Sequence, residues 1–115
     1  MKDIMKEIQY NGETYGLVFN LNVMEEIQKE YGSVMDWGDL SDGKAGEPDA
    51  KAVKFGLCAM INEYIDIQNE KNNTNRPFVN LKFVGRMITE LGLMNMTEVM
   101  NDTVIESTQS SEKNE

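Results

Sequence analysis

Acidic side chains are the first candidates for chemistry in this chain of 115 residues, which carries 20 of them. Glu25 and Glu26 are neighbours, and neighbouring side chains on a helix point about 100° apart, so the two carboxylates cannot share a proton. The acids between residues 36 and 49 miss the spacing that an EF-hand loop requires around its glycine. We therefore predict a solvated helix face, an acidic loop and no metal site.

Nucleophilic chemistry is limited by the absence of histidine and by a single cysteine, Cys58. These counts exclude the Ser-His-Asp triad, the Cys-His pair, imidazole zinc ligands and a disulfide within the chain. Cys58 lies in the most apolar run, where burial raises the thiol pKa and no base stands beside it. We expect a small core residue there, and we predict neither an enzyme nor a cofactor.

A small basic edge is the next candidate. Lys82 and Arg86 are four residues apart on one predicted helix, and Arg76 precedes them. Phosphate binding is driven by many bases, whereas this chain has 11 bases and a net charge of −9. We predict no nucleic-acid partner. A small DNA-binding regulator that uses this helix remains an alternative, and a gel shift at physiological salt would test it.

The nine methionines point to binding of another protein. Methionine packs irregular apolar surfaces and recurs on faces that accept variable partner helices. Apolar side chains at helical spacing also fill ordinary cores, and that alternative stays open. Trp37, with Val34 and Met35 beside it, is a second candidate contact patch. The main predicted contact face lies on the last two helices and comprises Phe83, Met87, Met94, Met96, Val99 and Met100.

The elements that would position these side chains begin with a β-hairpin. Residues 4–10 and 14–19 alternate apolar and polar side chains, and Asn11-Gly12 between them is a strong signal for a type I′ turn. A hairpin alone is marginal in water, so its apolar face must pack on helices.

Two helical segments and a loop are predicted after the hairpin. Asn20 or Asn22 can cap a helix that ends at Gly32, and Asn22 also heads a capping-box pattern. Ser33 can cap one short further turn. Residues 38–50 combine glycines with acids and have little to bury, so we predict a mobile loop.

A long helix is expected next, from Pro48 or Asp49 to about Gln68. Its middle, residues 55–61, carries no charge on any face, which is typical of a helix that other elements surround. The polar run that follows, residues 69–77, is predicted to end it.

Two shorter helices complete the pattern. Asn80 can cap a helix that Gly92 closes, and Asn95 can cap a last short helix. Residues 107–115 contain no core residue and are predicted to be a disordered tail. The sum is a single α+β domain over residues 1–106, with a hairpin and three to four helices around a central apolar helix.

Targeting signals are not evident in the sequence. No run approaches the roughly 20 apolar residues of a membrane span, and residues 1–10 lack the apolar stretch of a secretory signal. We expect a cytoplasmic protein that is not secreted and has no membrane partner.

The order of elements resembles a known family. Residues 2–32, KDIMKEIQYNGETYGLVFNLNVMEEIQKEYG, are similar to the start of the tail assembly chaperones of long-tailed bacteriophages and prophages. Residues 78–92, FVNLKFVGRMITELG, resemble the helix that follows the long central helix in that family. The chain departs from the family in its long 38–50 loop and in its asparagine-rich 69–75 segment.

The resemblance implies a non-enzymatic function in the bacterial host cell. Such proteins bind the long helical tape-measure protein while the tail tube polymerises, keep it soluble, and are absent from the finished virion. Family members are often made in two lengths by ribosomal frameshifting. The alternative is a structural virion component, such as a head–tail connector or a minor tail protein. The edge strand of the hairpin also leaves a homo-oligomer open.

Overall fold

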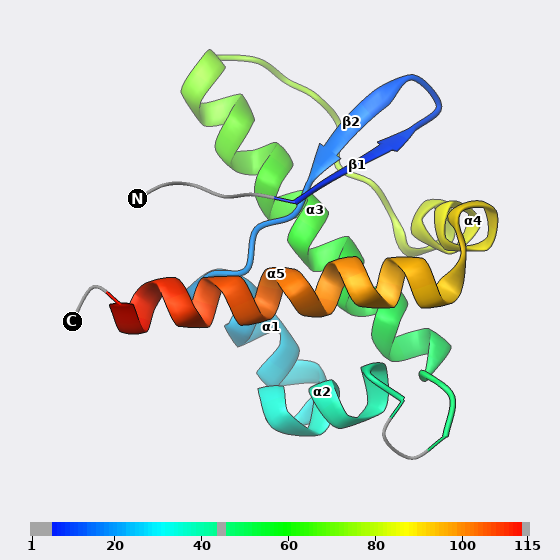
Figure 1. Ribbon diagram of the computed structural model, residues 1–115. Helices are drawn as coiled ribbons and strands as arrows, with labels where there is room; N and C mark the ends of the chain where they lie inside the picture. Colours follow the sequence, from blue (N-terminus) through cyan, green and yellow to red (C-terminus); the bar gives the residue numbers. More distant parts are fainter. Residues whose placement is uncertain (1–5, 44–45, 114–115) are drawn as a thin grey trace.

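The computed structural model describes residues 6–43 and 46–113, with side chains described as far as residue 108. Within these residues a two-stranded sheet precedes five helices, and α3 lies at the centre, in contact with every other helix and with β2 (Figure 1). The predicted α+β class with a long central helix is confirmed. The elements are β1 (Glu7–Tyr10), β2 (Glu13–Gly16), α1 (Leu21–Tyr31), α2 (Val34–Ser41), α3 (Ala50–Asn72), α4 (Leu81–Leu91) and α5 (Leu93–Lys113).

The hairpin forms as its turn sequence predicts. The strands are antiparallel, with Tyr10 opposite Glu13, and both turn residues have positive φ, 53° at Asn11 and 76° at Gly12. That pair of angles defines the type I′ turn, whose twist matches the twist of the flanking strands. The first predicted strand residues, 4 and 5, lie outside the described residues.

The apolar face of the hairpin packs on α3. Ile8, Tyr15 and Leu17 are buried, and the Val18 amide donates to the carbonyl of Met60 on α3 at 3.4 Å. This contact supplies the support that an isolated two-stranded sheet lacks.

Two caps fix the short helices that follow. The Asn20 side chain accepts a hydrogen bond from the Val23 amide, so Asn20 is the N-cap of α1, and Asn22 instead donates to Glu63 on α3. Ser33 caps α2 as predicted. Helix α2 continues to Ser41, so the prediction that a loop begins at residue 38 is wrong. The helix is longer than the single turn expected because Trp37 and Ser41 are buried against the rest of the fold.

The central helix α3 buries a nearly continuous apolar surface, as predicted. It is capped by Asp49, whose carboxylate accepts from the Ala52 amide at 3.0 Å. It extends to Asn72, beyond the predicted end near residue 68, and stops where Asn73 adopts a left-handed conformation. Its fully buried side chains are Ala52, Val53, Leu57, Met60, Ile61 and Ile65.

Two asparagines of α3 hold the extended connector to α4. Asn62 accepts from the Val79 amide at 2.8 Å and donates to the Val79 carbonyl at 3.0 Å. Asn69 makes the same pair of bonds with Arg76, at 2.9 and 3.0 Å. These side chains satisfy backbone groups that a neighbouring strand would otherwise satisfy. The asparagine-rich segment is therefore ordered by α3 rather than a free linker.

Replacing Asn69 with alanine is expected to lower the free energy of unfolding by about 1–3 kcal/mol, because two part-buried groups of Arg76 lose their partners. Asn72→Ala is the matched control, since Asn72 lies on the same helix and makes one exposed bond to Gln68. Urea denaturation followed by circular dichroism measures both. Equal effects of the two substitutions would contradict the clamp.

The last two helices meet at Gly92. Asn80 caps α4 through the Phe83 amide, as predicted, and Gly92 ends it. The last helix begins at Leu93, so the prediction that Asn95 caps it is wrong. The side-chain amide of Asn95 instead donates to the Leu91 carbonyl.

The last helix is also far longer than predicted. It runs to Lys113 and crosses the molecule in front of α3 (Figure 1), which replaces the tail predicted from residue 107. Met96, Met100 and Thr103 are buried along it, and the Ser107 hydroxyl donates to the Phe19 carbonyl at 2.8 Å. These contacts, spaced three or four residues apart, keep one face of α5 packed against the rest of the fold as far as Ser107.

Three helices converge on Gly56 of α3. A Cβ atom there would overlap the indole ring of Trp37 from α2 and would lie 3.0 Å from the sulfur of Met100 from α5. The Trp37 side chain is 1% exposed, and its Nε1–H donates to the Ala52 carbonyl at 2.9 Å. Gly56 is thus a point of close approach of α2 and α5 to α3.

Candidate functional site

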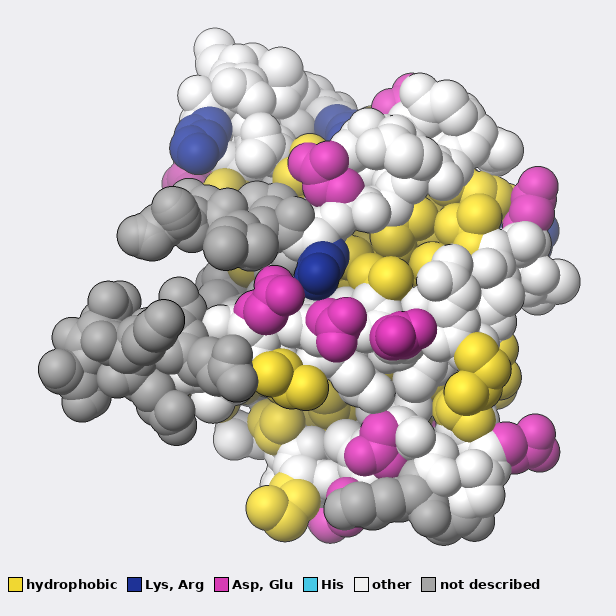
Figure 2. Space-filling view, viewed as in Figure 1, with side chains coloured by type: hydrophobic (Ala, Val, Ile, Leu, Met, Phe, Trp, Pro, Cys, Tyr) yellow, Lys and Arg dark blue, Asp and Glu magenta, His cyan; other side chains and the backbone are white. Residues whose placement is uncertain are grey.

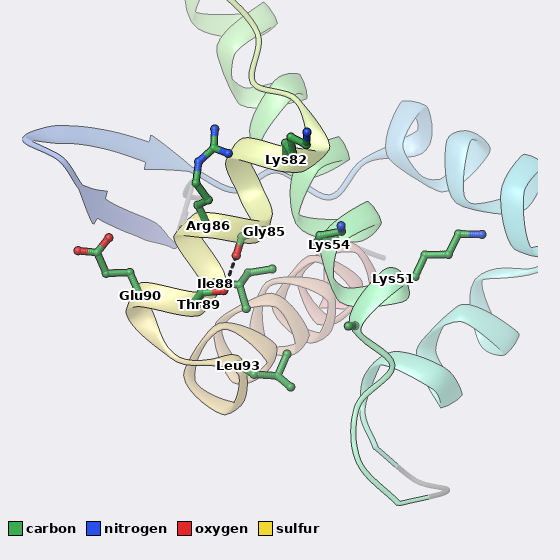
Figure 3. Close-up of a pocket in the computed structure, with 10 residues that line it drawn as sticks. Lys51, Lys54, Lys82, Gly85, Arg86, Ile88, Thr89, Glu90 and Leu93 are labelled. Atoms are coloured by element: carbon green, nitrogen blue, oxygen red, sulfur yellow. Dashed lines mark hydrogen bonds between the residues drawn. The ribbon is translucent and has the colours of Figure 1, made fainter.

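A groove over α4, with a volume of about 1100 Å³, is the largest of the described cavities. Its walls come from the first turns of α3, from α4 and from the start of α5 (Figure 3). We call it the α4 groove. It is lined by Ala50, Lys51, Lys54, Lys82, Gly85, Arg86, Ile88, Thr89, Glu90 and Leu93.

Helical spacing brings the basic side chains of the α4 groove together. Lys51 and Lys54 are three residues apart on α3, and Lys82 and Arg86 are four apart on α4, so each pair shares one helix face. In Figure 3, Lys51 and Lys54 lie on the α3 side of α4, and Arg86 lies on the side of the hairpin. The predicted basic edge on α4 is therefore one part of a larger basic site.

Gly85 forms a low point in the middle of α4. An added Cβ atom would lie 3.2 Å from Cδ of Lys54, so the stem of that lysine lies across the glycine. Long basic side chains cover apolar surface with their methylenes while the charged end stays in water. Ile88 and Leu93 supply the apolar surface beside it. The groove thus combines an apolar floor with a basic rim.

The charge of the α4 groove is opposite to that of the chain. Four of the 11 bases line it, against one of the 20 acids. Within the described part of the chain, Lys51 pairs with Glu30 at 3.3 Å, and Lys54, Lys82 and Arg86 have no ion pair. The three cations are therefore free to meet an anionic partner.

The single acid of the groove, Glu90, lies close to Tyr10 of the hairpin. Burial raises the pKa of the Tyr10 hydroxyl, and its hydrogen-bond partner Glu90 raises that pKa further. The Tyr10 ring also packs edge-on against Phe83, with the ring centres 5.6 Å apart. Four cations against this one acid leave the lining of the groove net positive.

Two smaller cavities adjoin the groove. One of about 430 Å³ shares Arg86 with it and lies against the 76–80 connector. The other, of about 390 Å³, shares Ala50 and Leu93 with it and has an acidic lining that includes Asp39, Glu47 and Asp49. The lining therefore changes from basic in the α4 groove to acidic in this neighbouring cavity, which includes Asp39 of α2.

The contact face predicted from the methionines is largely interior. Met87, Met96 and Met100 are at most 3% exposed, so those three predicted contacts are wrong and the core alternative holds for them. Phe83 is half-buried between Tyr10 and Tyr15 of the hairpin.

Two residues of the predicted contact face, Met94 and Val99, remain accessible to solvent at least in part. Met94 is 68% exposed, and Val99 is half-buried. Figure 2 shows hydrophobic side chains at the surface between the hairpin, α4 and α5, and acidic side chains along α5. The apolar surface of this face is thus smaller than predicted and bordered by acids.

The second predicted patch does not form. Trp37 is buried against Gly56, so its assignment to a contact surface is wrong, and Val34 is half-buried. Met35 alone remains open, at 75% exposure. An aromatic side chain on a short amphipathic helix faces the core when a glycine lies opposite to receive it.

The candidate acids show no gathering toward a metal. Glu25 and Glu26 are exposed on α1, and among residues with described placement no group of three acids or cysteines could hold an ion.

Cys58 lies half-buried on α3. Its thiol is 3.7 Å from the Val79 carbonyl, and burial, with a smaller contribution from Glu26, raises its pKa above the ordinary value of 9.0. The raised pKa agrees with the prediction, and Cys58 packs against the core cluster from its edge rather than from inside it.

The raised pKa of Cys58 gives a testable reactivity. At pH 8 the folded chain holds less thiolate than the unfolded chain, so we expect iodoacetamide to alkylate Cys58 more slowly in buffer than in 8 M urea. The folded state also keeps its proton to higher pH, so this group lowers stability as the pH rises through 9. Mass spectrometry of timed samples measures the rate, and equal rates in both solvents would contradict the assignment.

The α3 lysines of the groove were missed from the sequence. Lys51 and Lys54 share a face of a helix whose middle reads as apolar all round, and that reading hid its charged first turn. The three-residue spacing of Lys51 and Lys54 places both on one helix face, and it was the signal in the sequence that could have identified them.

Comparison of the chain with protein-family models, with curated proteins and with solved structures finds no match. Over the residues that the structure describes, the helices are too short or too polar for any of them to cross a membrane.

Proposed function

We propose that this chain is a tail assembly chaperone of a long-tailed bacteriophage or prophage, a non-enzymatic protein that binds the tape-measure protein during tail assembly. The proposal starts from the likeness of residues 2–32 and 78–92 to that family. The observation that carries it furthest is the α4 groove, because an open apolar floor with cations on its rim suits a polypeptide better than a small substrate.

Exposed apolar side chains of α4 and α5 support the same function. Leu81, the first residue of α4, and Met94, at the start of α5, are 46% and 68% exposed. Apolar side chains that are flexible and open can adapt to more than one partner segment. The acidic remainder of the surface keeps such a protein soluble while it holds an apolar partner.

Co-expression with the tape-measure protein tests this function. We expect the tape-measure protein to move from the insoluble to the soluble fraction and to co-purify with this chain. An unrelated acidic protein of similar size is the control for a general effect of charge. A tape-measure protein that is equally soluble with and without this chain would contradict the proposal.

Mass spectrometry of purified phage particles separates this function from a structural one. A chaperone is expected to be missing from the particles, whereas a connector or a minor tail protein would be present in fixed proportion to other tail proteins.

A further inference from the structure

We propose that the α4 groove binds an amphipathic helix whose apolar stripe is flanked on both sides by acidic side chains. This inference rests on the proposed function and deepens it, since it states which segments of the partner the chain selects. The occupant is identified by the charge and shape of the groove.

The first step is the shape. Gly85 leaves the backbone of α4 without a side chain at the middle of the groove, and only the mobile stem of Lys54 lies over it. Glycine on a helix face allows another helix to approach closely. The groove follows α4, whose 11 residues span about 16 Å. A partner helix of about three turns fits that length.

The second step is the charge. Lys54 borders α4 on one side, and Arg86 borders it on the other (Figure 3), while Lys51 points away from α4 and pairs with Glu30. A helix laid over Gly85 would therefore have cations along both flanks. Acids at those positions would form several ion pairs, while lysines there would meet like charges.

The third step sets aside other anionic occupants. Ile88 and Leu93 give the floor an apolar character that a nucleic-acid backbone would leave unused. A second copy of this chain would bring a net charge of −9 against another of −9, which opposes association over distances within a Debye length. An acidic amphipathic helix of a different protein satisfies both the floor and the rim.

The test uses two labelled, stapled helices of about three turns with the same leucine stripe, one flanked by glutamates and one by lysines. Fluorescence anisotropy with the full chain measures their binding. We expect the glutamate peptide to bind at least about tenfold more tightly at 50 mM salt, with the advantage shrinking at 500 mM.

Charge reversal at the groove supplies the second arm. The double variant Lys54→Glu/Arg86→Glu is expected to remove or invert the preference. The matched control, Lys29→Glu/Lys71→Glu, changes the net charge equally at two exposed positions on other faces and is expected to keep it. Circular dichroism verifies that both variants are folded.

Three results would overturn the inference: equal binding of the two peptides, a preference that survives the groove reversal, or a self-association that the groove reversal abolishes and that excludes the peptide. The outcome is separable from that of co-expression. A tape-measure protein kept soluble by the Lys54→Glu/Arg86→Glu variant would leave the chaperone function standing and remove the groove from it.

Discussion

Trp37→Ala is expected to lower the free energy of unfolding by about 3–5 kcal/mol, the range for removing a large buried aromatic side chain. The ring is 1% exposed and fills the space between α2, α3 and α5 beside Gly56. The substitution also removes the hydrogen bond that the Trp37 indole N–H donates to the Ala52 carbonyl at 2.9 Å. Because whole domains are stable by about 5–15 kcal/mol, this one change is expected to remove a large share of the stability of the fold.

Thermal or urea unfolding followed by far-ultraviolet circular dichroism measures the effect of Trp37→Ala, since the variant lacks the only tryptophan. Met35→Ala is the control on the same helix. Met35 is 75% exposed, and its truncation is expected to change stability by less than about 0.5 kcal/mol. Comparable losses in the two variants would mean that α2 is not docked through Trp37.

Gly56→Ala is expected to destabilise the protein, although alanine favours helices over glycine by up to about 1 kcal/mol. The new methyl group would overlap Trp37 and crowd Met100, and overpacking of this kind costs about 1–3 kcal/mol, occasionally more. Since the indole ring is rigid and enclosed, we expect the steric cost to exceed the helix gain, with a net loss of about 1–2 kcal/mol.

Gly85→Ala is the matched comparison for Gly56→Ala. Both glycines lie inside helices, but the methyl group at position 85 would meet only the mobile stem of Lys54, at 3.2 Å. We expect a gain of about 0.5–1 kcal/mol in the free energy of unfolding. Opposite signs for the same chemical change, measured by urea denaturation, are the expected result; a gain at both positions would show that α2 and α5 can move away from Gly56.

The elements that sequence predicted best are those set by local chemistry. The Asn11-Gly12 turn needs positive φ at both positions, and Asn20, Ser33 and Asn80 cap helices because their side chains accept the first free amides. These rules act within a few residues of the chain. They therefore hold before any tertiary contact is known.

The errors in element length have a tertiary cause. Residues 107–113 read as a polar tail, yet Ser107 reaches the Phe19 carbonyl across the fold and α5 continues. The 69–77 segment reads as a linker, yet Asn69 binds the backbone of Arg76. Polar contacts of this kind leave no periodic signal, because one well-placed side chain is enough.

The candidate site was predicted only in part. Lys82 and Arg86 were recognised as a basic edge, but Lys51 and Lys54 join them only when α3 and α4 pack together. Spacing showed that the methionines share helix faces, and it could not show that α5 turns Met96 and Met100 toward α3. The sequence thus indicates which side chains share a helix face, and the packing of the helices determines which faces are exposed to solvent.

The position of α5 has a consequence for how the protein is made. A ribosome delivers residues in order, so the hairpin and α1 to α4 emerge before Met100, whose sulfur packs beside Gly56. Until that last segment is released, the nascent chain has one side of its apolar interior open to solvent. The interval in which the growing polypeptide exposes that surface therefore lasts until the last helix has been released.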